Sequence, residues 1–266
     1  MAIITLENFL WVLAFIAVIV MPAKKGVAQA LPQETGETGL TVSQVVDRLV
    51  GMNAQRALAL KRYQSRRSYR LDYKGFPSDL HAEMTVDMSY QAPATKKFEV
   101  VSEGGSKWII NHIFRRLLES EREALLGENL ERTALNRQNY DFTMLEDEGD
   151  ARGCPYILGV QPKIPEKFLY RGRIWVNAKD FAVCRIESEP AKNPSFWITK
   201  TEIHHTYSKI GDFWLPASNR SISTMRWGGR ATLTIQYEEY KILEAGASNQ
   251  TDEKVSPASS SHSTTN

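Results

Sequence analysis

Histidines are the first residues in this chain whose chemistry could define a site, because an imidazole can bind a metal or transfer a proton. His204 and His205 are adjacent in a segment predicted to be a strand, so their side chains point to opposite faces and cannot easily share a metal. His81, His112 and His262 are isolated. The chain has no His-Glu-x-x-His or Cys-x-x-Cys spacing. We therefore expect structural or surface histidines and no metal site.

Acidic side chains give no clearer sign of catalysis. The run Glu146-Asp147-Glu148 with Asp150 could hold calcium, but a solvated hairpin end is the preferred interpretation. Glu119, Glu121 and Glu123 lie in an arginine-rich helical segment and are expected to be surface charges. The sequence shows no Gly-x-Ser-x-Gly elbow, no glycine-rich phosphate loop and no recognisable triad. We predict that the protein is not an enzyme and needs no cofactor.

The two cysteines, Cys154 and Cys184, cannot build a disulfide-rich scaffold or a four-ligand zinc site. They could pair in an oxidising compartment. The expected strand register places Cys154 near the far end of the strand that separates it from Cys184, which argues against a bond. The alternative is that both thiols are small core residues.

Aromatic and apolar side chains on the predicted strands are the best candidates for a binding site. Trp175 stands out because it interrupts a strand face that otherwise carries Arg171 and Arg173. Ordinary sheet packing is the alternative role for these side chains. The candidates for lining a hydrophobic cavity are Tyr69, Leu71, Tyr73, Trp108, Trp175, Trp197 and Trp214.

A basic run, KRYQSRRSYR (residues 61–70), contains five lysines and arginines with two tyrosines. Nucleic-acid binding could be inferred from that pattern alone. The composition of the whole chain argues against nucleic-acid binding, because it has 33 basic and 31 acidic residues and a net charge of only +2. We expect a solvated junction between a helix and a strand, with contact to anionic lipid head groups as the alternative.

The first half of the chain predicts one helix, four strands and a second helical region. Thr41 is a plausible cap for a helix over residues 42–60, in which apolar residues recur at helical spacing. Strands are predicted around Tyr69–Tyr73 and over residues 79–90, 96–104 and 106–111. Residues 112–137 are rich in Leu, Glu, Arg and Ala and predict helix, broken at Gly127.

After Asn139 the sequence predicts strand almost throughout. Seven segments are separated by turn signals, at 140–147, 153–161, 168–177, 181–189, 197–209, 213–226 and 230–242. With the four earlier strands this makes about eleven, and the short loops predict a large antiparallel meander.

One hairpin, residues 171–188, carries apolar residues on both faces. If Ala178-Lys179 is a two-residue loop, Val176 faces Phe181 and Ile174 faces Val183, and a bulge would shift this pairing. A sheet whose middle strands are apolar on both faces must be covered on both faces. The last predicted strand differs, because it alternates apolar and polar residues and so has one solvent-exposed face. A large twisted sheet tends to curl. We predict an α+β fold: a curled, half-open antiparallel β-barrel with helices over its concave face.

The two ends of the chain are predicted to lie outside this domain. Residues 9–23 are nearly all apolar, and Ala28-Gln29-Ala30 supplies a small-x-small cleavage pattern, so residues 1–30 read as a secretory signal. Lys24 and Lys25 follow the apolar run instead of preceding it, which leaves an uncleaved anchor as the alternative. Residues 31–40 form a flexible leader, 41–243 the folded domain and 244–266 a polar, disordered tail.

Three stretches of the chain resemble the LolA/LolB-like superfamily of bacterial exported proteins. They are VQPK (160–163), YRGRIWVNAKDFAVCRIESEPAKNPSFW (170–197) and YSKIGDFWLPAS (207–218). The resemblance implies a half-open barrel with a helical lid, placed in the periplasm, which binds an acyl chain or a lipid-modified protein in a hydrophobic cavity.

Two functions are preferred, and a third, an exported hydrolase, would require a cleft in which a nucleophile contacts a base. The first is a non-enzymatic periplasmic protein that holds acyl chains of a lipid or lipoprotein, with a role in outer-membrane lipoprotein sorting. The second is a regulatory or assembly module of the envelope, which presents the same fold to a protein partner. Neither function involves nucleic acid.

Overall fold

The computed structural model describes residues 39–146, 153–193 and 195–246. The predicted signal segment (1–30) and most of the leader lie outside these residues. The same holds for the tail from residue 247 and for the acidic run from Asp147 to Asp150.

The first element is the helix α1 (Val42–Ala59), which begins where the sequence predicts. Thr41 caps it, because its hydroxyl accepts from the Gln44 backbone while the Gln44 side chain accepts from the Thr41 backbone. Val45, Val46 and Leu49 form its buried stripe. Leu58, although apolar, is 62% exposed near the end of the helix.

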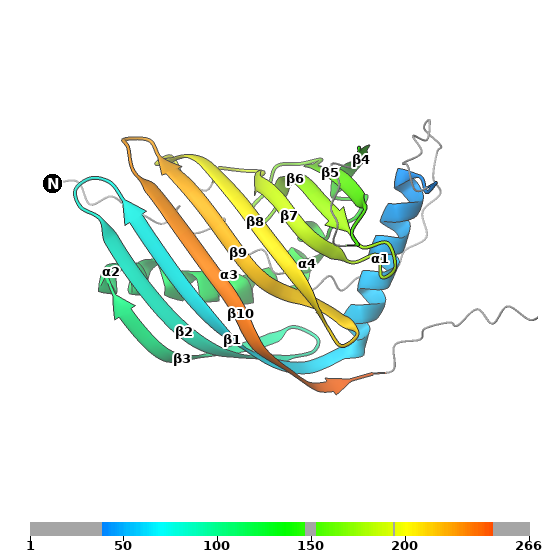
Figure 1. The fold of residues 1–266 in the computed structure, drawn as a ribbon, viewed down its shortest axis with the longest axis horizontal. Helices are drawn as coiled ribbons and strands as arrows, with labels where there is room; N and C mark the ends of the chain where they lie inside the picture. Colours follow the sequence, from blue (N-terminus) through cyan, green and yellow to red (C-terminus); the bar gives the residue numbers. More distant parts are fainter. Residues whose placement is uncertain (1–38, 147–152, 194, 247–266) are drawn as a thin grey trace, which may run out of the picture.

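One antiparallel sheet of ten strands makes up most of the described chain (Figure 1). It is curled and unclosed, with the spatial order β3-β2-β1-β10-β9-β8-β7-β6-β5-β4, so that β3 and β4 form its two edges. The strands are β1 (Leu60–Lys74), β2 (Leu80–Gln91), β3 (Thr95–Gly105), β4 (Tyr140–Leu145), β5 (Tyr156–Pro162), β6 (Tyr170–Val176), β7 (Val183–Pro190), β8 (Ile198–Ile210), β9 (Phe213–Met225) and β10 (Arg230–Ala245).

The predicted fourth strand, residues 106–111, is helical, which reduces the expected eleven strands to ten. Ser106 caps a continuous helical segment by accepting from the Ile109 backbone. The segment consists of α2 (Lys107–Ile109), the π-helical turn η2 (Ile110–Phe114) and α3 (Arg115–Ala124). The short apolar run Trp108-Ile109-Ile110 suits a strand locally, but its spacing to Phe114 and Leu117 is that of a buried helix face. A shorter helix, α4 (Gly127–Thr133), follows.

A single face of the sheet carries most of the buried side chains, and we call it the inner face. Directly paired residues of neighbouring strands share a face. The register therefore places one residue from each of nine strands in a row on this face: Met84, Tyr69, Ile235, Asn219, His205, Ile186, Ile174, Leu158 and Met144.

Helices pack on two separate zones of the inner face. The α2–α3 segment packs on β1, β2 and β10, with Phe114 and Leu117 against Tyr69, Met84 and Ile235. Helix α1 packs instead on β4 to β7. Between these zones lie β8 and β9, whose inner side chains are mostly polar. In Figure 1 the α2–α3 segment lies behind β1 and β10, and α1 stands at the opposite side.

The two-faced hairpin of β6 and β7 has a longer loop than predicted. Val176 pairs with Val183 and Ile174 with Ile186, so the predicted pairing was wrong. The reason lies in the loop: the Asn177 side chain accepts from the backbones of Lys179 and Asp180, which closes an Asx turn.

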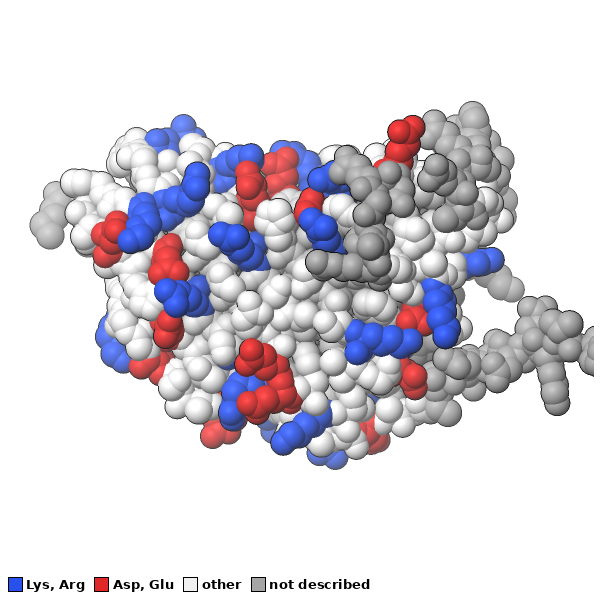
Figure 2. Space-filling view, viewed as in Figure 1, with Lys and Arg blue, Asp and Glu red and all other residues white. Residues whose placement is uncertain are grey.

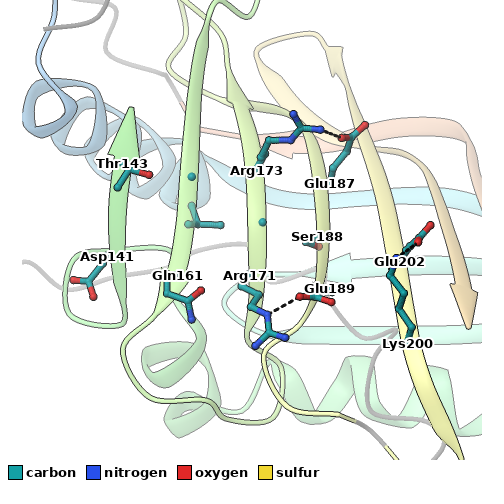
Figure 3. A pocket seen from close by; sticks show the side chains of 13 residues that line it. Asp141, Thr143, Gln161, Arg171, Arg173, Glu187, Ser188, Glu189, Lys200 and Glu202 are labelled. Atoms are coloured by element: carbon teal, nitrogen blue, oxygen red, sulfur yellow. Dashed lines mark hydrogen bonds and ion pairs between the residues drawn. The ribbon is translucent and has the colours of Figure 1, made fainter. Parts of the chain in front are cut away.

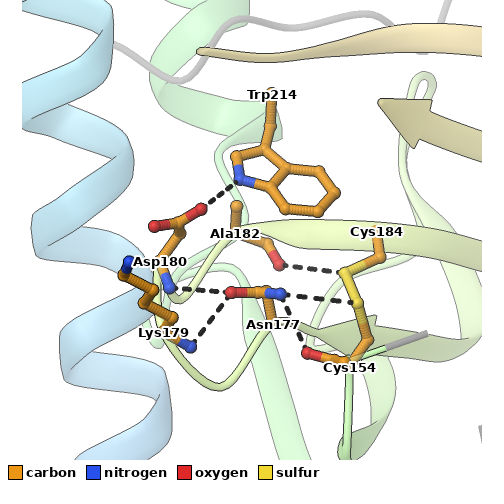
Figure 4. Close-up of a disulfide and its surroundings, with 8 residues drawn as sticks. Cys154, Asn177, Lys179, Asp180, Ala182, Cys184 and Trp214 are labelled. Carbon is orange, nitrogen blue, oxygen red and sulfur yellow. Dashed lines mark hydrogen bonds between the residues drawn. A yellow bond between two sulfur atoms is a disulfide. The ribbon is translucent and has the colours of Figure 1, made fainter. Parts of the chain in front are cut away.

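A disulfide between Cys154 and Cys184 covers the outer face of this hairpin (Figure 4). The expectation against a bond was wrong because Tyr156 pairs with Val176, and Val176 with Val183, so both cysteines lie at the same end of β6. Their Cα atoms are 6.6 Å apart. The bridge packs with Ile157, Trp175 and Trp214, and together these residues cover the second apolar face of the hairpin.

Candidate functional site

The centre of the inner face holds a buried polar cluster on β8 and β9. His205 is 2% exposed, and its Nδ1 lies 3.0 Å from the side-chain amide of Asn219. The Ser221 hydroxyl donates to the Asn219 side-chain oxygen. The His205 ring stacks on Tyr207 at 4.5 Å and approaches Tyr237 at 6.2 Å. Three polar side chains are thus fixed between two apolar zones.

A buried ion cluster joins α3 to the sheet next to these residues. Glu121 of α3 accepts from Arg67 of β1 at 2.6 Å and from Lys96 of β3 at 2.5 Å. The three side chains are at most 5% exposed. The expectation that Glu121 is a surface charge was therefore wrong. Burying a carboxylate is tolerated here because two cations bind it in good geometry.

The electrostatics of this region follow from burial. Burial alone would raise the pKa of Glu121, but the charges of Arg67 and Lys96 outweigh it and lower the pKa to about 2. Burial lowers the pKa of Lys96. Burial also lowers the pKa of His205 to about 4, so that its imidazole is neutral at pH 7. Two cations around one carboxylate leave the ion cluster with a net positive charge.

Three buried polar atoms in this region find no hydrogen-bond partner among the described residues. They are Ser65 Oγ, Arg67 Nε and His205 Nε2. A buried donor or acceptor without a partner costs about 1–3 kcal/mol, and such groups are uncommon in folded proteins. Together they offer hydrogen bonds to a polar group that enters from the inner side.

Of the predicted cavity residues, those on β1 do lie on the inner face. Tyr69 and Leu71 are buried under the α2–α3 segment, and Tyr73 packs against the same group at its margin. The Tyr73 hydroxyl donates to the backbone oxygen of Phe76. These three residues form one continuous apolar surface.

The four tryptophans among the predicted cavity residues do not lie on this apolar surface. Trp175 and Trp214 are on the outer face beside the disulfide, where Arg173 and Arg185 lie 5.3 and 4.6 Å from the Trp175 ring. The indole N–H of Trp214 donates to Asp180 (Figure 4). Trp108 is 44% exposed at the start of α2. The seven candidates are thus not brought together into one site.

Trp197 belongs to an aromatic group at the end of the sheet, in the loop before β8. Its ring meets Trp227 at 4.5 Å and Phe196 at 5.4 Å. Among the described residues, Trp197 is not part of the apolar cluster that contains Tyr69 and Leu71.

A groove of about 710 Å³ runs across the outer face of β4 to β8 (Figure 3). Its lining is charged, and its cations are paired: Arg171 with Glu189, Arg173 with Glu187, and Lys200 with Glu202. Figure 2 shows the same mixture of lysine, arginine and acidic side chains over the face turned to the viewer. The groove is therefore not a hydrophobic cavity. The lining is Asp141, Thr143, Gly159, Val160, Gln161, Arg171, Gly172, Arg173, Glu187, Ser188, Glu189, Lys200 and Glu202.

Sequence reasoning missed Arg67, Lys96 and Glu121 as members of one cluster. Arg67 offered one signal, because it shares the period-two face of Tyr69 and Leu71 and should be buried with them. Glu121 is four residues beyond Leu117 and so lies on the buried stripe of its helix.

Among the three described ranges, no helix is both long and apolar enough to cross a membrane. In the same ranges no three histidine, cysteine or acidic side chains are grouped so as to hold a metal ion.

Comparison with known proteins gives structural matches only. No family model matches the sequence, and neither does a curated protein. A DUF1329 family protein from Desulfovibrio piger matches with 16% identity and a TM-score of 0.38 over 76% of this chain and 92% of its own.

Two further solved structures carry LolA-type descriptions. A domain classed provisionally with outer membrane lipoprotein-sorting proteins, from Vibrio parahaemolyticus, has 11% identity and a TM-score of 0.38, covering 76% of this chain and 93% of its own. A LolA superfamily protein from Nitrosomonas europaea has 11% identity and a TM-score of 0.34, covering 76% and 94%.

Proposed function

We propose that this protein is a non-enzymatic lipid- or lipoprotein-binding protein that holds acyl chains between the inner face and the α2–α3 segment. The observation that carries the proposal is the construction of that interface. One helical segment places Ile109, Ile110, Ile113, Phe114 and Leu117 on the sheet. Its buried ion cluster with the sheet is the one around Glu121, and a more exposed ion pair joins Arg115 to Glu103 of β3.

Such a cover can exchange with a ligand. Burying an acyl chain is favourable by about 0.8 kcal/mol for each CH₂ group. The apolar side chains of the α2–α3 segment gain similar energy for similar area when they pack on the same surface. Because ligand and cover compete for one surface, net affinity is modest, which suits reversible carriage. In this mechanism α2–α3 swings outward as the chain enters.

The polar cluster gives the ligand a polar end. Arg67 Nε and His205 Nε2 are buried beside the apolar surface and have no hydrogen-bond partner among the described residues. A carbonyl or phosphate oxygen could accept from Arg67 Nε. We propose that the polar part of the ligand lies against β8 and β9, and that Tyr69 and Leu71 contact its hydrocarbon. Tyr73 and Trp108 would then lie at the open margin.

The test is binding of a fluorescent fatty acid, together with mass spectrometry of lipids extracted from the native protein. The proposal expects saturable uptake and faster hydrogen exchange of the backbone amides in α2–α3 when the probe is present. Leu71→Gln, on the apolar surface, should abolish uptake. Thr232→Gln, on the wet face of β10, is the matched control and should bind as the unchanged protein does. Absence of both extracted lipid and probe uptake would refute the proposal.

We also propose that the protein acts in the periplasm after export. The apolar segment at residues 9–23, followed by Ala28-Gln29-Ala30, supports export, and the disulfide suits an oxidising compartment. An inner-membrane anchor is the alternative to cleavage. N-terminal sequencing of the mature protein separates the two, because cleavage near Ala30 leaves residue 31 as the first.

The outer groove favours a second candidate, an envelope regulatory or assembly module that binds a protein partner. Gly159 leaves part of the groove floor without a side chain, and a Cβ there would lie 2.5 Å from Thr143 Oγ1. A groove with paired charges of both signs suits a polar protein segment. Loss of a captured envelope partner in Arg171→Glu, with unchanged uptake of the acyl probe, would favour this function.

A further inference from the structure

Three neighbouring loops at one end of the sheet carry large exposed aromatic side chains. Phe76 lies in the β1–β2 loop and is 85% exposed. Trp227 lies in the β9–β10 loop at 74%, and Phe196 in the β7–β8 loop at 65%. With the half-buried Trp197 they form a group that we call the aromatic tip. Exposed aromatic groups of this kind mark interaction sites.

Contacts between the loops hold the tip together. The Trp197 ring lies 4.5 Å from Trp227 and 5.4 Å from Phe196. Arg226 stacks on Phe196 at 4.3 Å and donates from Nε to the Phe196 backbone oxygen. The rings of Phe196, Trp197 and Trp227 are thus presented from a shared, hydrogen-bonded base.

The Phe76 loop is adjacent to this base. Gly75 and Gly229 approach so closely that a Cβ on Gly75 would lie 2.7 Å from the Gly229 Cα. The β1–β2 and β9–β10 hairpins therefore end side by side, as Figure 1 shows at the upper left. Their tips project beyond the sheet, so the rings can enter a surface without moving the core.

The charge around the tip is positive. Within residues 74–80, 190–198 and 225–230 the basic side chains are Lys74, Lys192, Arg226 and Arg230, and the single acid is Asp79. Lys74 pairs with Asp79, and the other three cations are exposed. A positive rim around aromatic rings complements an anionic surface.

We propose that the aromatic tip is a membrane-docking site that inserts its rings into the interface of an anionic lipid bilayer. Tryptophan prefers this interface because its ring is apolar and its N–H can remain hydrated. The projecting hairpins and basic rim fit a lipid surface better than the flat, charge-depleted core typical of a protein interface. Each inserted ring and each cation near the surface adds to binding.

Docking at this end would also orient the rest of the molecule. Ser106, at the start of the α2–α3 segment, donates from its backbone to His81, which lies one residue into β2 beyond the Phe76 loop. Trp108, 44% exposed, follows two residues later. The end of the proposed cover at which α2 begins would therefore face the membrane.

The test measures by sedimentation how much of the purified protein binds to lipid vesicles. The vesicles contain anionic phosphatidylglycerol and neutral phosphatidylcholine at a ratio of about 3:7. The Phe196→Ala/Trp227→Ala variant should partition about tenfold more weakly or worse. Lys192→Gln/Arg230→Gln should also weaken binding, and it should remove most of the salt dependence. Brominated lipid should quench the tryptophan emission of the unchanged protein, and Trp227→Phe should bind normally with less quenching.

Matched controls come from the opposite end of the sheet, where Leu60 pairs with Ala245. Leu58→Ala and Leu243→Ala remove side chains that are 62% and 49% exposed there, and neither should alter partition. Equal vesicle binding by the tip variant and the unchanged protein would overturn the proposal. So would self-association that depends on the tip while vesicles go unbound, since a second copy would then be the partner.

The docking proposal and the proposed function fail separately. The acyl probe is measured without vesicles, so the tip variant should take it up as the unchanged protein does. Vesicle binding without probe uptake would leave docking in place and remove the carrier function.

Discussion

Replacing Glu121 by glutamine removes the one carboxylate that balances Arg67 and Lys96 in the interior. Arg67 and Lys96 are 1% and 0% exposed, so the variant leaves two buried cations without an acid. Removing one partner of a buried ion pair typically costs about 3–5 kcal/mol. We expect Glu121→Gln to lower the free energy of unfolding at pH 7 by that amount, measured by urea denaturation with circular dichroism.

The pH dependence gives an independent measure of the same group. The pKa of Glu121 falls from an ordinary 4.5 to about 2 in the folded protein. Because the pKa of Glu121 is lower in the folded state, the stabilisation of the fold by the ionised carboxylate is complete above about pH 4.5. It is lost as the pH falls toward 2. At about 1.4 kcal/mol for each pKa unit, the change is about 3 kcal/mol. The stability difference between the two proteins should therefore shrink over this window.

The control is Glu123→Gln on the same helix. Glu123 pairs with Lys167 at 2.7 Å but is 42% exposed, so its loss should cost less than about 1 kcal/mol. Replacing the whole cluster by Arg67→Met, Lys96→Met and Glu121→Leu should recover much of the stability, since no charge is then buried alone. A loss below 1 kcal/mol in Glu121→Gln at pH 7 would refute the reasoning, because it would mean that water reaches the cluster.

Other predictions address the disulfide, the histidine and a backbone contact. Reducing Cys154–Cys184, which closes a loop with a separation of 30 residues, should lower the unfolding free energy by about 3–4 kcal/mol, and the double serine variant should be insensitive to reductant. Burial lowers the pKa of His205 to about 4, so the stability that neutral His205 gives the fold is complete above pH 6.5 and is lost as the pH falls toward 4. The unfolding free energy of His205→Gln should not fall with pH in this way. An NMR titration of the unchanged protein should show no protonation of His205 at pH 5.5. Gly172→Ala places a Cβ 2.2 Å from the Glu187 carbonyl oxygen and should reduce the melting temperature, whereas no loss would show that β6 can shift there.

Period-two patterns predicted the strands well where one face is wet. In β10, Leu233, Ile235 and Tyr237 are buried and alternate with more exposed residues, as expected from the sequence. The capping residue Thr41 likewise located the start of α1. These elements are predictable because burial and capping depend on residues close together in the sequence.

The predictions from sequence were wrong where contacts between residues distant in the sequence decide the local structure or burial. Residues 106–111 have a local strand pattern, and only the packing of Phe114 and Leu117 on the sheet makes the segment helical. The disulfide depended on the β5–β6 and β6–β7 registers, and an Asx turn at Asn177 and a shift after Trp175 help to set the second of these. The burial of Glu121 depended on two cations that are 54 and 25 residues away in the sequence.

The Cys154–Cys184 bridge makes the two halves of the sheet mechanically unequal. It crosses over β6 and links the segment before β5 to β7, within the half of the sheet that carries α1. In the described chain the half that carries α2–α3 relies on noncovalent contacts. We therefore expect thermal opening to begin in the half that carries α2–α3, and the half that holds the disulfide to open later.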